Sequence, residues 1–156
     1  MITIKPYLPE YKERLIDIFK SNMPLYFAEE ELPLFRRFLE EDVLEMSDRP
    51  YSVIWKEEVI VGCGGIGINE PTKYTPEPHI ILCWGMIHRQ YHKQGLGKAL
   101  LEFRIKQSRH LYPGIKIALG TTQHSFPFFE KYGFKTVCYE KDHWAKGLDL
   151  YQMELP

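Results

Sequence analysis

The feature that most constrains this chain is a buried-strand pattern that runs into a basic, glycine-containing turn and then into an amphipathic helix, over residues 86–101. Gly95 and Gly97 allow backbone conformations closed to other residues and let the main chain approach a ligand. The free N–H groups and positive dipole end of a helix favour phosphate oxygens, and Lys93 and Lys98 add positive charge. The segment therefore predicts an anion-binding cradle, against the alternative that two glycines merely cap a turn.

Two well-known phosphate-binding motifs do not fit this turn. A P-loop requires the pattern G-x-x-x-x-G-K-S/T, which does not occur in the chain. A dinucleotide-binding turn requires a third glycine at a position where this chain has Leu100. The remaining candidate ligand for this turn is a pyrophosphate-bearing cofactor of another class.

Hydrophobic periodicity along the chain alternates between strand and helix patterns. We predict strands over residues 2–6, 51–55, 59–68, 79–87, 115–119, 134–139 and 148–155. We predict helices over residues 11–19 and 35–46, from residue 96 to a stop near residue 113, and over residues 125–131. The order β α α β β β α β α β β indicates an α/β (α+β) fold, a mixed sheet with helices on both faces.

Composition excludes several classes of function. With 156 residues and no linker or repeat, the chain is predicted to form one domain over 1–156. A net charge of −1 disfavours general nucleic-acid binding, although the basic run His88–Lys98 keeps a local nucleic-acid site open as an alternative. Three widely spaced cysteines and the lack of a long apolar stretch predict reduced thiols, no membrane partner and a cytoplasmic protein. No residue spacing suits a metal, so none is predicted.

Two motifs give the chain a resemblance to a known family. His92–Gly97 fits the coenzyme A loop of the GNAT acetyltransferase superfamily, R/Q-x-x-G-x-G/A, with histidine at its first position. Phe128–Phe134 is similar to the F-Y-E-K-x-G-F of the family's C-terminal helix. The segment Gln123–Ser125, together with Asp142, Gly147 and the closing Met153–Leu155, further resembles a subgroup of uncharacterised small acetyltransferases. The resemblance implies a single, mostly antiparallel sheet of about seven strands with about four helices, and an enzyme that moves acetyl from acetyl-CoA to a primary amine.

The resemblance also implies a cofactor-binding set along the fourth strand, the loop and the C-terminal helix. The pantetheine arm would pair with the backbone of Gly85–Ile87, and histidine at position 92 would make the phosphate contact weaker and dependent on pH. The implied set is Gly85, Met86, Ile87, His92, Lys93, Gln94, Gly95, Leu96, Gly97, Lys98, Ala99, Thr122, Ser125, Phe128 and Phe129.

The implied groups that stabilise charge and donate a proton follow from the same resemblance. The Ile87 N–H is the oxyanion donor, a role that needs no particular side chain. The family's proton-donating tyrosine falls on Phe129, which cannot donate a proton, so Ser125, Tyr132 and solvent are the candidates. The alternatives are that Ser125 caps the helix and that Tyr132 packs in the core.

A general base is needed because an amine is protonated at pH 7. The family's glutamate falls on Ile81, and strand alternation offers His79, acting through water, on the same face. The alternative is a surface histidine at a strand start. Cys83 lies in a buried-strand pattern, where a thiol is usually inert, so direct attack in a ternary complex is favoured over a covalent cysteine intermediate.

The family builds its acceptor pocket between the first helices. The segment Met23–Glu31 combines aromatic and acidic side chains, and carboxylates there would attract a cationic amine. The alternative is an acidic helix start with two core aromatics. Lys141–Lys146, with Trp144, is predicted as a loop that forms another wall. The candidate acceptor-binding residues are Tyr26, Phe27, Glu30 and His124.

A non-catalytic acyl-CoA-binding sensor module is the main alternative to an enzyme, because the family's tyrosine and glutamate are replaced at positions 129 and 81. The acceptor is expected to be a small-molecule or peptide amine. A homodimer would be usual for the family.

Overall fold

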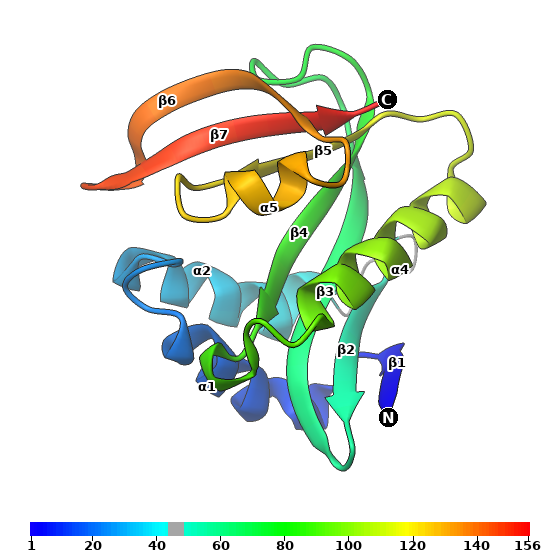
Figure 1. Cartoon of the computed structure of the whole chain (residues 1–156), viewed down its shortest axis with the longest axis vertical. Helices are drawn as coiled ribbons and strands as arrows, with labels where there is room; N and C mark the ends of the chain where they lie inside the picture. Colours follow the sequence, from blue (N-terminus) through cyan, green and yellow to red (C-terminus); the bar gives the residue numbers. More distant parts are fainter. Residues whose placement is uncertain (44–48) are drawn as a thin grey trace.

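The computed structural model describes residues 1–43 and 49–156, and its central feature is a sheet of seven strands in the order β1-β2-β3-β4-β5-β7-β6 (Figure 1). Neighbouring strands are antiparallel except β4 and β5, which are parallel. The predicted mixed, mostly antiparallel sheet is confirmed. The strands are β1 (Ile2–Pro6), β2 (Tyr51–Lys56), β3 (Val59–Asn69), β4 (His79–Ile87), β5 (Ile117–Thr121), β6 (Lys135–Ala145) and β7 (Leu148–Leu155).

Four α-helices in the described part of the chain occupy the predicted places between the strands, so the predicted order of elements is confirmed. Short 3-10 turns precede α1, α2 and the loop before α4, and a π-helical segment follows α2. Met46, the predicted end of the second helix, lies outside the described residues. The helices are α1 (Lys12–Ser21), α2 (Leu32–Arg37), α4 (Leu96–Leu111) and α5 (Phe126–Glu130), and the short segments are Pro9–Tyr11, Glu29–Glu31, Phe38–Asp42 and Arg89–Tyr91.

The helices cover both faces of the sheet. Val53 of β2 packs in one cluster with Leu15 of α1 and Phe35 of α2. Its neighbour Ile54 packs in another cluster with Leu100 of α4. Because successive side chains of a strand point to opposite faces, α1 and α2 lie on one face and α4 on the other.

The sixth strand is longer than its sequence pattern predicts. We predicted a strand over residues 134–139 and a loop at Lys141–Lys146, but β6 continues to Ala145, so most of that loop is strand. Side-chain bonds to the main chain hold the polar stretch in place: the Gly147 N–H donates to Asp142 Oδ1 at 2.7 Å, and the Asp142 N–H donates to Asp149 Oδ1 at 2.9 Å. The sequence alone does not show these cross-strand bonds.

The fourth and fifth strands separate from each other. In the described part of the chain they pair at two positions, Ile80↔Ile117 and Ile81↔Ala118. Beyond these positions β5 pairs with β7 and β4 pairs with β3, so the two parallel strands diverge (Figure 1). The register between β3 and β4 also shifts around Trp84, which has a φ of 43°. The divergence leaves one edge of β4 without a strand partner among the described residues.

Among the residues that the structure describes, no helix combines the length and the apolar character that a membrane crossing requires.

Candidate functional site

The start of α4 has the backbone geometry that an anion cradle requires. Gly95 takes the N-cap position with a φ of 79°, and Lys93, two residues earlier, has a φ of 63°. Within the described residues no side chain caps this helix, and its first turn contains no acidic residue. The first helical bond runs from the Ala99 N–H to the Gly95 carbonyl, so the N–H groups of residues 96–98 point out of the helix end. This end of α4 can therefore accept an anion.

The Ile87 N–H points to the open edge of β4. The His88 N–H donates to the Val61 carbonyl of β3 at 2.7 Å, and antiparallel bonding alternates along a strand. Ile87, paired with Gly62, therefore directs its N–H and C=O away from β3. That edge lies where β4 and β5 have separated, so the N–H can donate to a ligand placed there.

The Ile87 carbonyl is held from two directions. Asn22, at the end of α1, donates from Nδ2 to this oxygen at 3.0 Å and to the Ile18 carbonyl at 2.9 Å. His92 places Nε2 2.8 Å from the same oxygen, which requires a proton on Nε2. The His92 side chain thus bonds to β4 through Nε2, and its contact with a phosphate stays a prediction. Sequence reasoning missed Asn22, whose position after the last turn of a predicted helix is the signal that could have found it.

Replacing Asn22 with alanine should lower the free energy of unfolding by about 1–3 kcal/mol, because the buried carbonyls of Ile18 and Ile87 each lose a donor. Urea denaturation of both proteins would measure the change. The matched control is Lys20→Ala on the exposed side of α1, which should change the free energy by less than about 0.5 kcal/mol. Equal effects of the two substitutions would contradict the anchoring role of Asn22.

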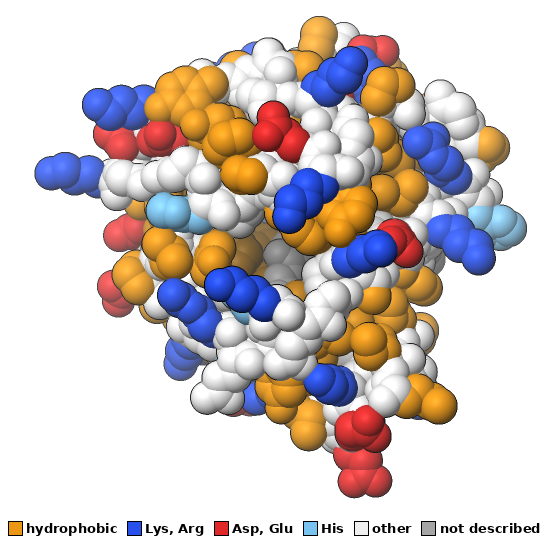
Figure 2. Space-filling view, in the orientation of Figure 1, with side chains coloured by type: hydrophobic (Ala, Val, Ile, Leu, Met, Phe, Trp, Pro, Cys, Tyr) orange, Lys and Arg blue, Asp and Glu red, His pale blue; other side chains and the backbone are white. Residues whose placement is uncertain are grey.

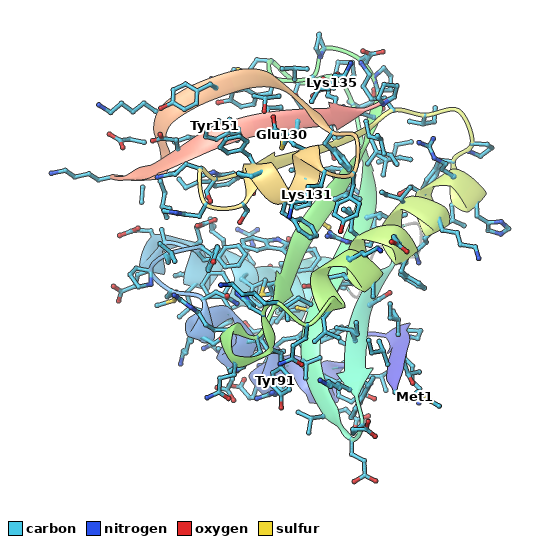
Figure 3. All side chains as sticks on the ribbon, in the orientation of Figure 1. Met1, Tyr91, Glu130, Lys131, Lys135 and Tyr151 are labelled. Atoms are coloured by element: carbon cyan, nitrogen blue, oxygen red, sulfur yellow. The ribbon has the colours of Figure 1, made fainter. Side chains whose placement is uncertain are left out.

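The surface is hollowed over β4, between α5 and the turn that precedes α4 (Figure 2). Phe128 of α5 approaches the start of α4: a Cβ on Gly97 would lie 3.5 Å from its ring. Figure 3 shows the Lys131 side chain beside this hollow, at the end of α5. Phe128 of α5 and the start of α4 therefore lie close together beside this hollow.

The aromatic residues of α5 pack mainly on one another. The Phe128 ring lies 5.1 Å from the rings of both Phe129 and Tyr132, and the Phe129 ring lies 5.8 Å from that of Phe134. These rings extend the core cluster between α4 and the sheet. The core-packing alternative for Tyr132 is consistent with these contacts.

Ser125 takes the N-cap position of α5, but its hydroxyl makes no capping hydrogen bond within the described chain. Thr122 stabilises this turn instead. Its carbonyl accepts from the N–H groups of Ser125 and Phe126, and its Oγ1 accepts from the His124 N–H at 3.2 Å. The capping role predicted as an alternative for Ser125 is therefore wrong, and the hydroxyl is left available to a ligand.

Three of the predicted residues, Tyr26, His92 and His124, lie close together. The Tyr26 ring lies 5.3 Å from the His92 ring and 6.2 Å from the His124 ring, and the Arg89 guanidinium lies 5.5 Å from the Tyr26 ring. Phe27 instead stacks on Phe19 at 4.7 Å, inside the core of α1 and α2. Of the two aromatic residues, Tyr26 is thus the one beside the coenzyme loop.

A cavity of about 350 Å³ lies next to this group. It joins the segment between α1 and α2 to the turn between β6 and β7, which are the two walls predicted for the acceptor. The two acidic residues on its wall are Glu29 and Glu30, and the basic one is Lys146. Its lining residues are Pro24, Leu25, Ala28, Glu29, Glu30, His124, Ala145, Lys146, Gly147 and Leu148.

His79 does not join the other predicted site residues. It starts β4, eight residues before Ile87, and a strand of that length spans roughly 25 Å. Its ring is buried, with 1% exposed, and Nδ1 lies 2.8 Å from the Glu77 carbonyl oxygen. The surface-histidine alternative is therefore wrong, and His79 is too far from Ile87 to act on the same carbonyl.

The cysteines near the site are poor nucleophiles. Burial raises the pKa of the Cys83 thiol to about 11 and that of Cys63 to about 12. The reactive thiolate is therefore scarce at neutral pH. Among the described residues, no group of three or more His, Cys, Asp or Glu side chains is arranged to hold a metal ion.

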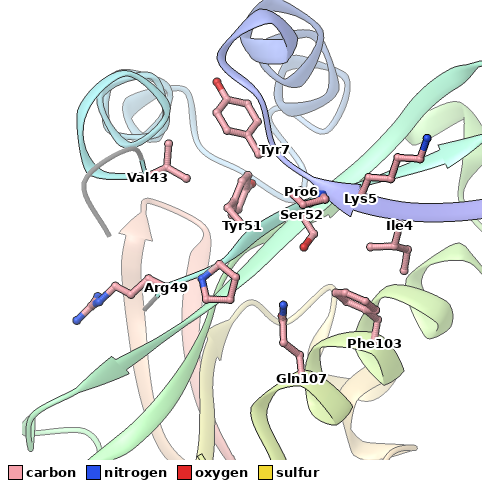
Figure 4. Close-up of a pocket in the computed structure, with 11 residues that line it drawn as sticks. Ile4, Lys5, Pro6, Tyr7, Val43, Arg49, Tyr51, Ser52, Phe103 and Gln107 are labelled. Carbon is pink, nitrogen blue, oxygen red and sulfur yellow. The ribbon is translucent and has the colours of Figure 1, made fainter. Parts of the chain in front are cut away.

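A second cavity, of about 300 Å³, lies between β1, β2 and α4 (Figure 4). Its lining includes Tyr7, Tyr51, Phe103 and Gln107, and none of the predicted site residues. It lies at the edge of the sheet formed by β1 and β2, away from the separation of β4 and β5.

Comparisons with known proteins extend these findings. A family model described as the acetyltransferase (GNAT) family matches residues 12–134. A solved ribosomal-protein-alanine N-acetyltransferase from Brucella melitensis is similar at 20% identity and a TM-score of 0.76, with 98% of each chain covered. YncA from Salmonella typhimurium, solved with its cofactor acetyl-CoA, is similar at 17% identity and a TM-score of 0.75, over 99% of this chain and 93% of that one. An aminoglycoside 6'-N-acetyltransferase complexed with coenzyme A is similar at 18% identity and a TM-score of 0.71, over 98% and 96%. No curated protein matches the sequence.

Proposed function

Because the chain belongs to the acetyltransferase (GNAT) family, we propose that it is an N-acetyltransferase that transfers the acetyl group of acetyl-CoA to a primary amine. The observation that carries this proposal is that the acid-free start of α4 and the outward-facing Ile87 N–H border one hollow. The first suits a pyrophosphate, and the second suits the oxygen of a thioester carbonyl.

The proposed cofactor contacts lie at the start of α4 and at the end of β4. The N–H groups of residues 96–98, with Lys93 and Lys98, would hold the pyrophosphate. The open backbone of Gly85–Ile87 would pair with the pantetheine arm as a strand does. A Cβ at Gly95 would meet no atom within 4 Å, so the space before α4 is open for these contacts.

The proposed transfer is direct. Acetyl-CoA supplies an activated acetyl group: as the amine nitrogen bonds to its carbonyl carbon, the carbon–sulfur bond breaks and the sulfur takes up a proton. The Ile87 N–H would stabilise the carbonyl oxygen, and the Ser125 hydroxyl or the Tyr132 hydroxyl would donate to the sulfur. Solvent would accept the proton that the amine loses, since His79 is remote.

The proposed acceptor site is the cavity beside Tyr26. Its carboxylates would attract a cationic amine. Glu30→Lys should raise the KM for such an amine about fivefold to tenfold while the acetyl-CoA affinity stays unchanged, because the reversed charge repels one substrate and lies outside the cofactor hollow. Steady-state kinetics with both substrates varied would measure this.

Glu58→Lys is the matched control for Glu30→Lys, because Glu58 is an exposed glutamate in the turn between β2 and β3. It should leave both Michaelis constants unchanged. The acceptor assignment would be rejected by an unchanged KM in the Glu30 variant, or by an equal change in the two variants.

The proposed function is tested first by calorimetric titration with acetyl-CoA and with free coenzyme A. A spectroscopic assay of thiol release would follow, with a panel of polyamines, amino acids, aminoglycosides and lysine peptides. Binding followed by amine-dependent thiol release supports the enzyme. Tight binding without release for any amine favours the acyl-CoA sensor, and absence of binding contradicts both.

A further inference from the structure

Arg104 is a buried cation for which the described chain provides no counter-ion. It lies on α4, about two helical turns after Gly97, and its side chain is 5% exposed. Within residues 1–43 and 49–156, no carboxylate forms an ion pair with it, and its Nε has no hydrogen-bond partner. A buried charge without a partner destabilises the folded protein, so a functional role is needed to explain why this one is present.

The guanidinium lies against the irregular part of β4. A Cβ on Gly85 would come within 2.5 Å of Arg104 Nη2 and 2.8 Å of Cζ, and one on Gly64 would come within 3.2 Å of Cζ. The two glycines therefore make room for the charged group. Gly85 follows Trp84, the residue with a positive φ, and begins the stretch whose backbone borders the open edge. The charge thus lies against one face of β4 at Gly85, two residues before Ile87, the proposed oxyanion donor.

The groups around Arg104 leave its charge uncompensated at neutral pH. They are Tyr51 of β2, Cys63 of β3 and Cys83 of β4. Burial raises the pKa of each well above 7, to about 11 for Cys83 and about 12 for Cys63, so all three remain neutral. Arg49, whose charge lowers the pKa of Cys83, is a second cation. The surroundings therefore place a net positive charge beside Gly85.

We propose that the Arg104 guanidinium acts through space on the open edge of β4, where it stabilises the negative charge that forms on the thioester oxygen and on the departing sulfur. This inference rests on the proposed function. A fixed charge in a water-poor region needs no reorganisation when the negative charge appears. Burial lowers the pKa of the guanidinium, but arginine starts so far above neutrality that the group keeps its proton at neutral pH.

The test uses the sulfur of free coenzyme A as a probe. A thiol that binds beside a cation should have a pKa lowered by about one to two units from its usual value near 8.5. Binding of coenzyme A should then tighten as the pH rises through the lowered pKa toward 8.5. Acetyl-CoA carries no proton on sulfur. The ratio of the coenzyme A affinity to the acetyl-CoA affinity therefore cancels the pH dependence that both ligands share, including that of their phosphates.

Calorimetry from pH 6.5 to pH 9 should show the affinity ratio of coenzyme A to acetyl-CoA rising roughly fivefold to fiftyfold in the native protein. In Arg104→Met the ratio should stay flat, kcat should fall at least about tenfold, and the acetyl-CoA affinity should stay within about threefold. The thermal midpoint of this variant should be unchanged or higher, because an apolar side chain of similar length replaces an unpaired charge.

Two further variants make the test specific for charge. Arg104→Lys keeps the charge and should retain part of the pH-dependent rise, and it serves equally if the methionine variant does not fold. Arg109→Met removes an exposed arginine from the same helix and should behave as the native protein does.

The inference would be overturned if the affinity ratio rose equally in the native protein and in Arg104→Met, or if it stayed flat in the native protein. Either result would leave the proposed function standing. A loss of kcat matched by an equal loss of acetyl-CoA affinity and a lower thermal midpoint would show a structural role only. If the native protein binds neither coenzyme, the proposed function fails, and the inference fails with it.

Discussion

Gly97→Trp is expected to weaken acetyl-CoA binding at least about a hundredfold. Gly97 is the second residue of α4, and a Cβ there would already lie 3.5 Å from the Phe128 ring. An indole at this position would fill the space between the start of α4 and α5, and it would shield the N–H groups that are proposed to hold the pyrophosphate. Calorimetric titration of the purified variant measures the loss directly.

The matched control is Lys106→Trp, which places the same side chain on the exposed face of the same helix. It should bind acetyl-CoA as the native protein does. Circular dichroism should show the same helix content in both variants. Native-like affinity in the Gly97 variant would contradict the placement of the cofactor.

Phe19→Ala is expected to lower the free energy of unfolding by about 3–5 kcal/mol. Phe19 is fully buried on α1, and its ring lies 4.7 Å from that of Phe27, 5.3 Å from that of Phe35 and 6.3 Å from that of Trp84. Removing it leaves a cavity among the three remaining aromatic rings, Phe27, Phe35 and Trp84. Urea denaturation followed by tryptophan fluorescence would measure the effect.

Leu34→Ala provides the comparison, because Leu34 is 59% exposed on the neighbouring helix. That substitution should change the free energy of unfolding by less than about 0.5 kcal/mol. A loss below about 1 kcal/mol in the Phe19 variant would show that the aromatic cluster is less tightly packed than its ring distances indicate.

The order of elements and the place of the coenzyme loop could be predicted because they depend on local patterns. β4 begins at His79 and ends at Ile87, as the apolar run predicts, and α4 begins directly after Gly95. Tyr26 and His124, two of the candidate acceptor-binding residues, lie close together with their rings 6.2 Å apart, while their binding of an acceptor stays a prediction.

The remaining features depend on contacts between distant parts of the chain. Which edge the Ile87 N–H faces is set by the register with β3, and the distance of His79 is set by the length of β4. The polar stretch of β6 resembles a loop because its stabilising bonds come from β7 and the turn between the two strands. The burial of Arg104 depends on glycines in two other strands, which no local pattern connects to α4.

The unpartnered edge of β4 has a consequence for strand-to-strand aggregation. An open strand edge normally invites a strand from another molecule, and natural proteins protect such edges. Here α5 and the turn before α4 flank a hollow over β4 (Figure 2), so these two elements stand in the way of a neighbouring sheet. A single narrow chain can still enter. A slender extended ligand can therefore reach the main-chain N–H and C=O groups of this edge, whereas a strand of a neighbouring sheet cannot.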